Sequence, residues 1–202
     1  MIEPLAITLG DAAGIGPEII AKAFRDAPDA LRGCFVAGDL DDGLPPAVLE
    51  DEPYDLIVAA DVLEHVRDPE QVLQELHDVL VAGGRLLVSV PNFGHWYPRL
   101  RVVSGRFDYD RRGILDRGPV RFFPRRSFDR VLHRSGWHAL QREVTGLPFD
   151  VVDRGGRGGL GAGLRATVGR LDALATRLRP TLFGYQLVYE LEPARGRLGS
   201  SL

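Results

Sequence analysis

The stretch from Tyr54 to Pro91 reads YDLIVAADVLEHVRDPEQVLQELHDVLVAGGRLLVSVP, and it contains a complete strand–helix–strand unit. Asp55 to Ala60 is a short apolar run with β-branched residues, which is typical of a strand covered on both faces. Arg85 to Val90 has the same character, and Pro91 is expected to stop it. Two buried strands joined by a helix form a right-handed crossover, so the stretch predicts a parallel sheet.

The helix between these strands carries its own start and stop signals. Asp68 is the expected N-cap and Pro69 occupies the first helical position. Gly83 and Gly84 are expected to end the helix, because glycine tolerates positive φ. Ligands of open α/β sheets sit outside the carboxyl ends of the strands. Here those ends are 60–65 and 91–95.

The phrase YDLIVAADVLEHVRDP, followed by LxxGGRLLVSVPN, resembles the class I S-adenosylmethionine-dependent methyltransferases, and most of all small-molecule members with a D-x-LEH-x-x-DP signature (types 11 and 12). The resemblance runs from about Phe35 to Glu190. It implies a Rossmann-like, mostly parallel α/β sheet with helices on both faces and an antiparallel edge hairpin. It also implies S-adenosylmethionine as the cofactor.

The N-terminal residues have a different pattern. Leu5 to Leu9 is a short apolar strand, and a glycine-rich turn and a helix starting at Pro17 follow it, an arrangement that suits an anion. LAITLGDAAGIGPEIIAKAF resembles the start of 4-hydroxythreonine-4-phosphate dehydrogenase, an NAD-dependent enzyme, with Ala12 where that family has proline. This second resemblance covers about the first 26 residues, at most up to Asp39, and nothing after residue 40 is expected to share it.

The chain therefore reads as a hybrid. We expect one methyltransferase-like domain over 1–193, made of a foreign-looking segment 1–38 and a body 39–193, followed by a disordered tail 194–202. About 38 residues precede Asp39, which is room for one strand–helix unit and a second strand. The methyltransferase resemblance implies a further unit, so one N-terminal βα unit is expected to be missing.

The methyltransferase resemblance also implies the cofactor contacts. Asp39 matches the acid on the adenine side, whereas no residue matches the acid that holds the ribose hydroxyls. Glu64 and His65 are expected to brace the loop that follows the first strand of the unit. The predicted cofactor-binding set is Gly10, Asp11, Gly14, Gly16, Asp39, Leu40, Ala60, Asp61 and Val62.

A long stretch, Phe93 to Pro124, is expected to be irregular and to form a lid or substrate loop. His95 is the candidate general base and Tyr97 a second catalytic candidate, while Tyr109 and Arg121 are candidates for substrate binding. Residues 91–130 hold 10 arginines and four aspartates. Because the guanidinium fork suits phosphate and carboxylate groups, an anionic methyl acceptor is expected. Related family members have a histidine where this chain has Pro119.

The remaining segments are predicted to be single helices, strands or irregular connections. Asp41 to Pro53 is expected to be irregular, Arg125 to Ser135 a helix, and Trp137 to Val144 and Tyr185 to Leu191 strands. A helical apolar stripe between Leu160 and Leu178 could belong to the core, to a homodimer surface or to a membrane-surface helix.

Composition narrows the function classes. The single cysteine, Cys34, excludes a disulfide framework and a thiolate metal site. No apolar run approaches the roughly 20 residues of a membrane span, and no signal-peptide pattern is present, so a cytoplasmic protein is expected. A pI near 6.0 argues against a nucleic-acid partner. The leading function is methyl transfer to a small molecule. The alternatives are a catalytically inactive hybrid and an NAD-dependent dehydrogenase.

Overall fold

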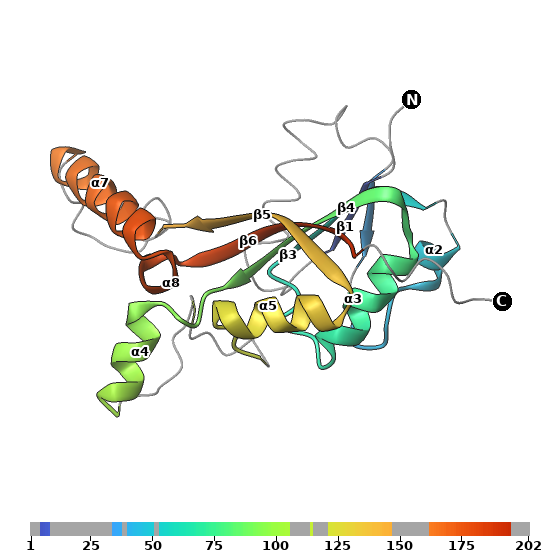
Figure 1. Cartoon of the computed structure of the whole chain (residues 1–202), viewed down its shortest axis with the longest axis horizontal. Helices are drawn as coiled ribbons and strands as arrows, with labels where there is room; N and C mark the ends of the chain where they lie inside the picture. Colours follow the sequence, from blue (N-terminus) through green and yellow to red (C-terminus); the bar gives the residue numbers. More distant parts are fainter. Residues whose placement is uncertain are drawn as a thin grey trace.

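A computed structural model describes residues 5–8, 34–37, 40–50, 53–105, 114, 121–146 and 162–194. Its centre is a six-stranded sheet with the order β2-β1-β3-β4-β6-β5 (Figure 1). The strands are β1 (Leu5–Thr8), β2 (Cys34–Ala37), β3 (Tyr54–Ala60), β4 (Leu80–Pro91), β5 (Trp137–Thr145) and β6 (Gln186–Pro193).

The pairing confirms the predicted sheet. The neighbours β2, β1, β3 and β4 are parallel, while β6 is antiparallel to both β4 and β5. The mostly parallel sheet with an antiparallel edge pair is therefore present. The two strands before the methyltransferase-like stretch, β1 and β2, are the two that the 38-residue N-terminal segment has room for.

The helices are α2 (Pro46–Leu49), α3 (Pro69–Asp78), α4 (Trp96–Val103), α5 (Arg125–Arg134), α7 (Ala162–Leu178) and α8 (Pro180–Phe183). Helices α3 and α5 pack against each other on one face of the sheet (Figure 1). Phe128 of α5 meets Tyr189 of β6 with ring centroids 5.3 Å apart, and Trp137 Nε1 donates to the carbonyl of Leu73 on α3. The helix that we expected after Gly16 lies outside the described residues.

The start of α3 forms as predicted, but its end does not. The Asp68 side chain accepts from the backbone N–H of Gln71, as an N-cap does. The helix ends at Asp78, however, and Gly83 and Gly84 lie inside β4. The prediction that they end the helix was therefore wrong.

Strand pairing gives the physical reason for this early end. Tyr54 pairs with Leu80 and its N–H donates to the carbonyl of Val79, so the chain joins the sheet directly after the helix. The register then shifts before the next pair, Leu56 with Arg85, which makes room for an irregular glycine segment. A Cβ on Gly84 would lie 3.1 Å from the Tyr54 carbonyl oxygen, a tight contact that favours glycine where the two backbones approach each other.

Two segments expected to be irregular contain helices. Within 41–53, Pro46 opens the one-turn helix α2 at a position where proline suits a helix start. Within 93–124, α4 forms over eight residues, and Pro98 is tolerated because it lies in the first turn, where the backbone N–H has no helical partner. Tyr109 and most of the rest of this second segment lie outside the described residues.

The described leucines at the end of α7 are not part of the core. Leu171 and Leu174 are exposed on this helix, and 70% of the Leu178 surface is accessible. In Figure 1 the helix projects from the end of the sheet. The core interpretation therefore fails for Leu171 and Leu178, the two leucines of the stripe whose side chains are described, while the homodimer and membrane-surface alternatives stay predictions. In the part of the chain that the structure describes, no helix combines the length and the hydropathy that crossing a membrane requires.

Candidate functional site at the carboxyl edge of the sheet

Three strands end together at one edge of the sheet. Thr8, the last residue of β1, pairs with Ala37 of β2 on one side and with Ala59 of β3 on the other. The segments that leave these three strands therefore start from the same edge. Of the predicted cofactor contacts that follow them, Gly10, Asp11, Gly14, Gly16 and Asp39 lie outside the described residues.

Asp61 directly follows β3 and adopts an unusual backbone conformation. Its φ of 54° places a non-glycine residue in the left-handed region, which costs conformational energy and is often found at functional sites. The N–H of Asp61 donates to the carbonyl of Ser89 on β4 at 3.0 Å, which holds the turn against the neighbouring strand.

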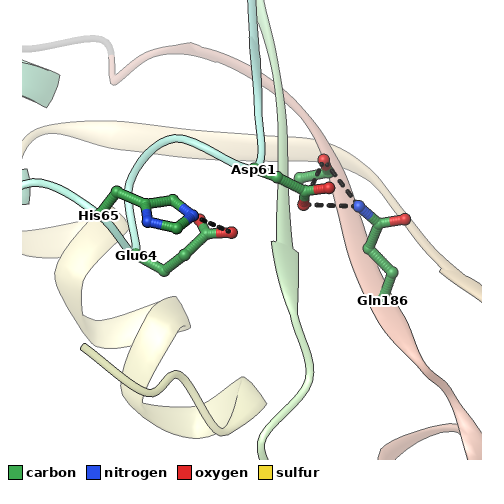
Figure 2. A network of polar contacts seen from close by, with 5 residues as sticks. Asp61, Glu64, His65 and Gln186 are labelled. Atoms are coloured by element: carbon green, nitrogen blue, oxygen red, sulfur yellow. Dashed lines mark hydrogen bonds and ion pairs between the residues drawn. The ribbon is translucent and has the colours of Figure 1, made fainter. Parts of the chain in front are cut away.

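The Asp61 carboxylate is held in place by two other strands. Its Oδ1 accepts from Gln186 Nε2 at 2.6 Å and from Ser89 Oγ at 3.2 Å (Figure 2). Burial raises the pKa of Asp61, and these two hydrogen bonds oppose the rise. Among the described residues, no hydrogen bond to the second oxygen, Oδ2, is formed, so that oxygen is available to a ligand.

Sequence reasoning missed both hydrogen-bond partners of Asp61. Ser89 left a signal, since it is a hydroxyl residue within the apolar strand RLLVSVP. Gln186 left none, because it lies 125 residues further along the chain and only the sheet order brings it near Asp61.

Glu64 and His65 lie in the turn after Asp61 (Figure 2). Only 2% of the Glu64 surface is exposed, its Oε2 has no hydrogen-bond partner among the described residues, and its Oε1 is 3.9 Å from His65 Nε2. Burial, followed by the nearby charge of Asp61, raises the pKa of Glu64 to about 8. The carboxyl group is therefore mainly neutral at pH 7.

The bracing role predicted for this turn is carried in part by its backbone. The carbonyl of Glu64 accepts from the N–H of Arg121, and the Arg121 guanidinium donates through Nε to the carbonyl of Arg67 at 3.1 Å. Arg121, which we predicted to bind substrate, thus holds two loops together. Its substrate-binding role stays a prediction.

Two more predicted cofactor contacts have buried side chains. Leu40 and Val62 both belong to the hydrophobic core, whereas Ala60 is exposed at the end of β3. Any contact of Leu40 or Val62 with a cofactor would therefore be made through backbone atoms.

His95 is buried, with 1% of its surface exposed, and it is the N-cap of α4. Its Nδ1 accepts from the N–H of Tyr97 at 3.2 Å, so the neutral ring carries its proton on Nε2, which has no partner among the described residues. Burial lowers the pKa of His95, which favours this neutral form. Tyr97 accepts a hydrogen bond from Arg101 Nη1 through its hydroxyl at 2.7 Å.

Asn92 and the start of β6 connect the two groups of candidate residues. The Asn92 side chain is fully buried and donates to the carbonyls of Thr181 and Gly184, which fixes α8 beside the end of β4. Tyr185 then meets the His95 ring edge-on at 6.1 Å, and its neighbour Gln186 binds Asp61. Asp61 and His95 are thus joined through the neighbours Gln186 and Tyr185, while Glu64 and His65 lie in the turn that follows Asp61.

The chain matches a known protein family. A family model described as a methyltransferase domain matches residues 11–142, which is well over half of the chain. Similar solved structures include the YcgJ protein of Bacillus subtilis (TM-score 0.53, 14% identity, 96% of this chain and 93% of that one). A SAM-dependent methyltransferase from Archaeoglobus fulgidus is also similar (TM-score 0.53, 11% identity, 93% and 85%).

The structural likeness shows the fold and not the reaction. The [4+2]-cyclase SpnF has a similar fold as well (TM-score 0.52, 14% identity, 96% of this chain and 76% of that one). At such identities the shared fold leaves the chemistry open.

A curated relative supports the second resemblance. The chain is 36% identical over 107 residues to 4-hydroxythreonine-4-phosphate dehydrogenase of Beijerinckia indica, and the match covers 53% of this chain but only 28% of that enzyme. A match of this length extends beyond residue 40, so our expectation that nothing there resembles that enzyme was wrong. Within the described ranges, no group of three or more His, Cys, Asp or Glu side chains could hold a metal ion.

Proposed function

The chain belongs to the methyltransferase-domain family, and on that premise we propose that it transfers the methyl group of S-adenosylmethionine to a small anionic acceptor. The observation that carries this proposal is the Asp61 carboxylate, fixed at the carboxyl edge of the sheet with one oxygen available. A carboxylate in that state suits the hydroxyl and amino donors of a nucleoside cofactor.

The residues at this edge fit such a cofactor. Gln186 and Ser89 already fix the Asp61 side chain by hydrogen bonds. The side chain would therefore lose little rotamer entropy when it accepts a hydrogen bond from a ligand. Asp61 also has a strained φ, and strained backbone positions cluster at active sites and ligand clamps. S-adenosylmethionine, when bound, supplies an electrophilic methyl group for in-line displacement.

The protein's own contribution to the reaction would be mainly positional. Bringing the acceptor and the methyl group into line supplies a large share of the acceleration in such transfers. A general base is needed only if the acceptor must lose a proton. His95 is the candidate for that step, although its Nδ1 lone pair already accepts the Tyr97 N–H and would have to give up that bond.

A matched pair of variants tests the role of Asp61. We expect Asp61→Asn to bind S-adenosylhomocysteine about tenfold more weakly, because a charge-assisted hydrogen bond is replaced by a neutral one. Glu190→Gln is the control, since Glu190 is a half-exposed acid on β6 that pairs with Arg85 at 3.6 Å. Equal calorimetric affinities for wild type and Asp61→Asn would remove Asp61 from the cofactor site.

A second candidate function rests on the dehydrogenase match. That match covers little more than a quarter of the dehydrogenase, so an NAD-dependent oxidation has much weaker support than methyl transfer. NAD therefore serves as the parallel ligand in the binding experiment.

A further inference from the structure

A hollow of about 240 Å³ lies on the face of the sheet that α5 covers. Three arginines from three different elements line it: Arg125 at the start of α5, Arg142 on β5 and Arg177 near the end of α7. Apolar atoms of Val144, Leu187 and Pro180 line it as well. The hollow thus combines an apolar wall with a cluster of cations.

The cations of the hollow exceed the nearby anions. Asp129 is shared by Arg125 and Arg142, at 3.9 and 3.8 Å, and it also accepts a 2.9 Å hydrogen bond from the Tyr189 hydroxyl. Both arginine distances are longer than a hydrogen bond, so the guanidinium N–H groups remain available to a ligand. Arg177 forms no ion pair with any described residue.

One acid also lines the hollow and opposes this excess. Glu143 accepts a hydrogen bond from Gln141 Nε2 at 2.6 Å through its Oε1. The three positively charged arginines outnumber the two acids, Glu143 and Asp129, so the hollow keeps a net positive charge. Arginine recognises carboxylate and phosphate groups by paired N–H donors, and the apolar wall would hold an uncharged body.

The hollow and the proposed site of methyl transfer share strand β6. Leu187 directly follows Gln186, the residue that binds the Asp61 carboxylate, and the two side chains point to opposite faces of that strand. Pro180 opens α8, which Asn92 ties to the end of β4. The wall of the hollow thus reaches the end of β4 through α8, and an acceptor bound there would have to extend past the start of β6 to reach the Asp61 side of the sheet.

We propose that this hollow, lined by Arg125, Arg142 and Arg177, binds the charged end of the methyl acceptor, a small organic phosphate monoester or carboxylate with an apolar body. The identification of the ligand as the acceptor rests on the proposed function. The anion-binding site itself does not.

The first test is binding of phenyl phosphate and of benzoate, with benzyl alcohol as the neutral probe. We expect both anions to bind and the alcohol not to bind. Arg142→Gln and Arg177→Gln should each weaken anion binding about tenfold, the loss expected for one charge-assisted hydrogen bond. Arg134→Gln, an exposed arginine at the end of α5 outside the hollow, should leave it unchanged. Circular dichroism checks the fold, and Arg177→Gln keeps the test valid if Arg142→Gln fails to fold.

S-adenosylhomocysteine binding, measured on the same samples, separates the two proposals. Cofactor binding without arginine-dependent anion binding overturns the hollow and leaves the proposed function standing. Arginine-dependent anion binding without cofactor binding supports the anion site and overturns its link to methyl transfer.

An acceptor screen then uses matched pairs of phosphorylated and dephosphorylated compounds, and of carboxylates and their amides. Methylation of only the charged members, with a raised KM in Arg177→Gln, supports the assignment and shows which anion is used. Equal methylation of charged and neutral members contradicts it.

Discussion

At the scale of single residues, the buried carboxyl of Glu64 is the most unusual group in the candidate site. It lies in the LEH signature, only 2% of its surface is exposed, and burial raises its pKa from 4.5 to about 8. A carboxyl group in this state holds its proton at pH 7, so the native protein binds a proton there that the unfolded chain releases.

This difference predicts how stability depends on pH. Because the pKa of Glu64 is raised in the native state, its contribution is fully present below about pH 4.5 and is lost as pH rises through about 8. We predict that the free energy of unfolding of the wild type falls by a few kcal/mol relative to Glu64→Gln between those limits. Urea titrations of both proteins at about pH 5, 7 and 9 measure the difference.

The glutamine variant is the matched comparison, because it keeps the shape of the side chain and cannot ionise. Parallel stability profiles for the two proteins would show that Glu64 has an ordinary pKa and is solvated in solution.

Single residues also show how far the sequence could predict the site. Asp61 could be named from the strand–signature pattern, because a polar residue directly after a buried parallel strand lies at the ligand edge. Its partner Gln186 could not, because the contact joins two strands that are far apart along the chain. Short-range patterns predicted Asp61 as a site residue, whereas long-range pairing decides which residues hold it.

At the scale of elements, His95 has two roles to separate: the N-cap of α4 and the predicted general base. His95 was predicted as a general base, and the structure uses its Nδ1 as the N-cap of α4. Local signals predicted the start of α3 well, since the Asp68 cap and Pro69 act within one turn. They failed at Gly83 and Gly84, because pairing of Leu80 with Tyr54 ends the helix before the glycines are reached.

A pair of substitutions separates the two roles of His95. We expect His95→Ala to lower the free energy of unfolding by about 1 kcal/mol or more, the usual cost of a lost N-cap. His95→Asn should recover much of that loss, since asparagine is a strong N-cap residue but has no imidazole. Denaturant unfolding measures the stability of each variant.

Turnover with a methyl acceptor completes this comparison. Slow turnover in both variants would support the general-base prediction. If the His95→Asn variant instead recovers the wild-type rate together with stability, the role of His95 is limited to capping α4.

At the scale of the whole molecule, the strand–helix–strand unit of residues 54–91 was enough to predict a parallel sheet, and the family resemblance supplied the antiparallel edge pair. The six strands follow that plan, with β1 and β2 from the N-terminal segment beside β3. The projecting position of α7 could not be foreseen, because an apolar stripe at helical spacing has the same pattern whether it is buried or exposed. In our proposal, this fold positions a cofactor site that includes Asp61.

Isothermal titration with S-adenosylhomocysteine, with NAD as the parallel ligand, is the decisive measurement for that cofactor site. We predict binding of S-adenosylhomocysteine with a Kd on the order of micromolar, and no binding of NAD. Such a result would mean that the N-terminal segment and the edge around Asp61 together complete a methyltransferase cofactor site. Absence of S-adenosylhomocysteine binding by folded protein would contradict the proposal and leave a methyltransferase fold without its activity, while binding of NAD alone would favour the dehydrogenase alternative.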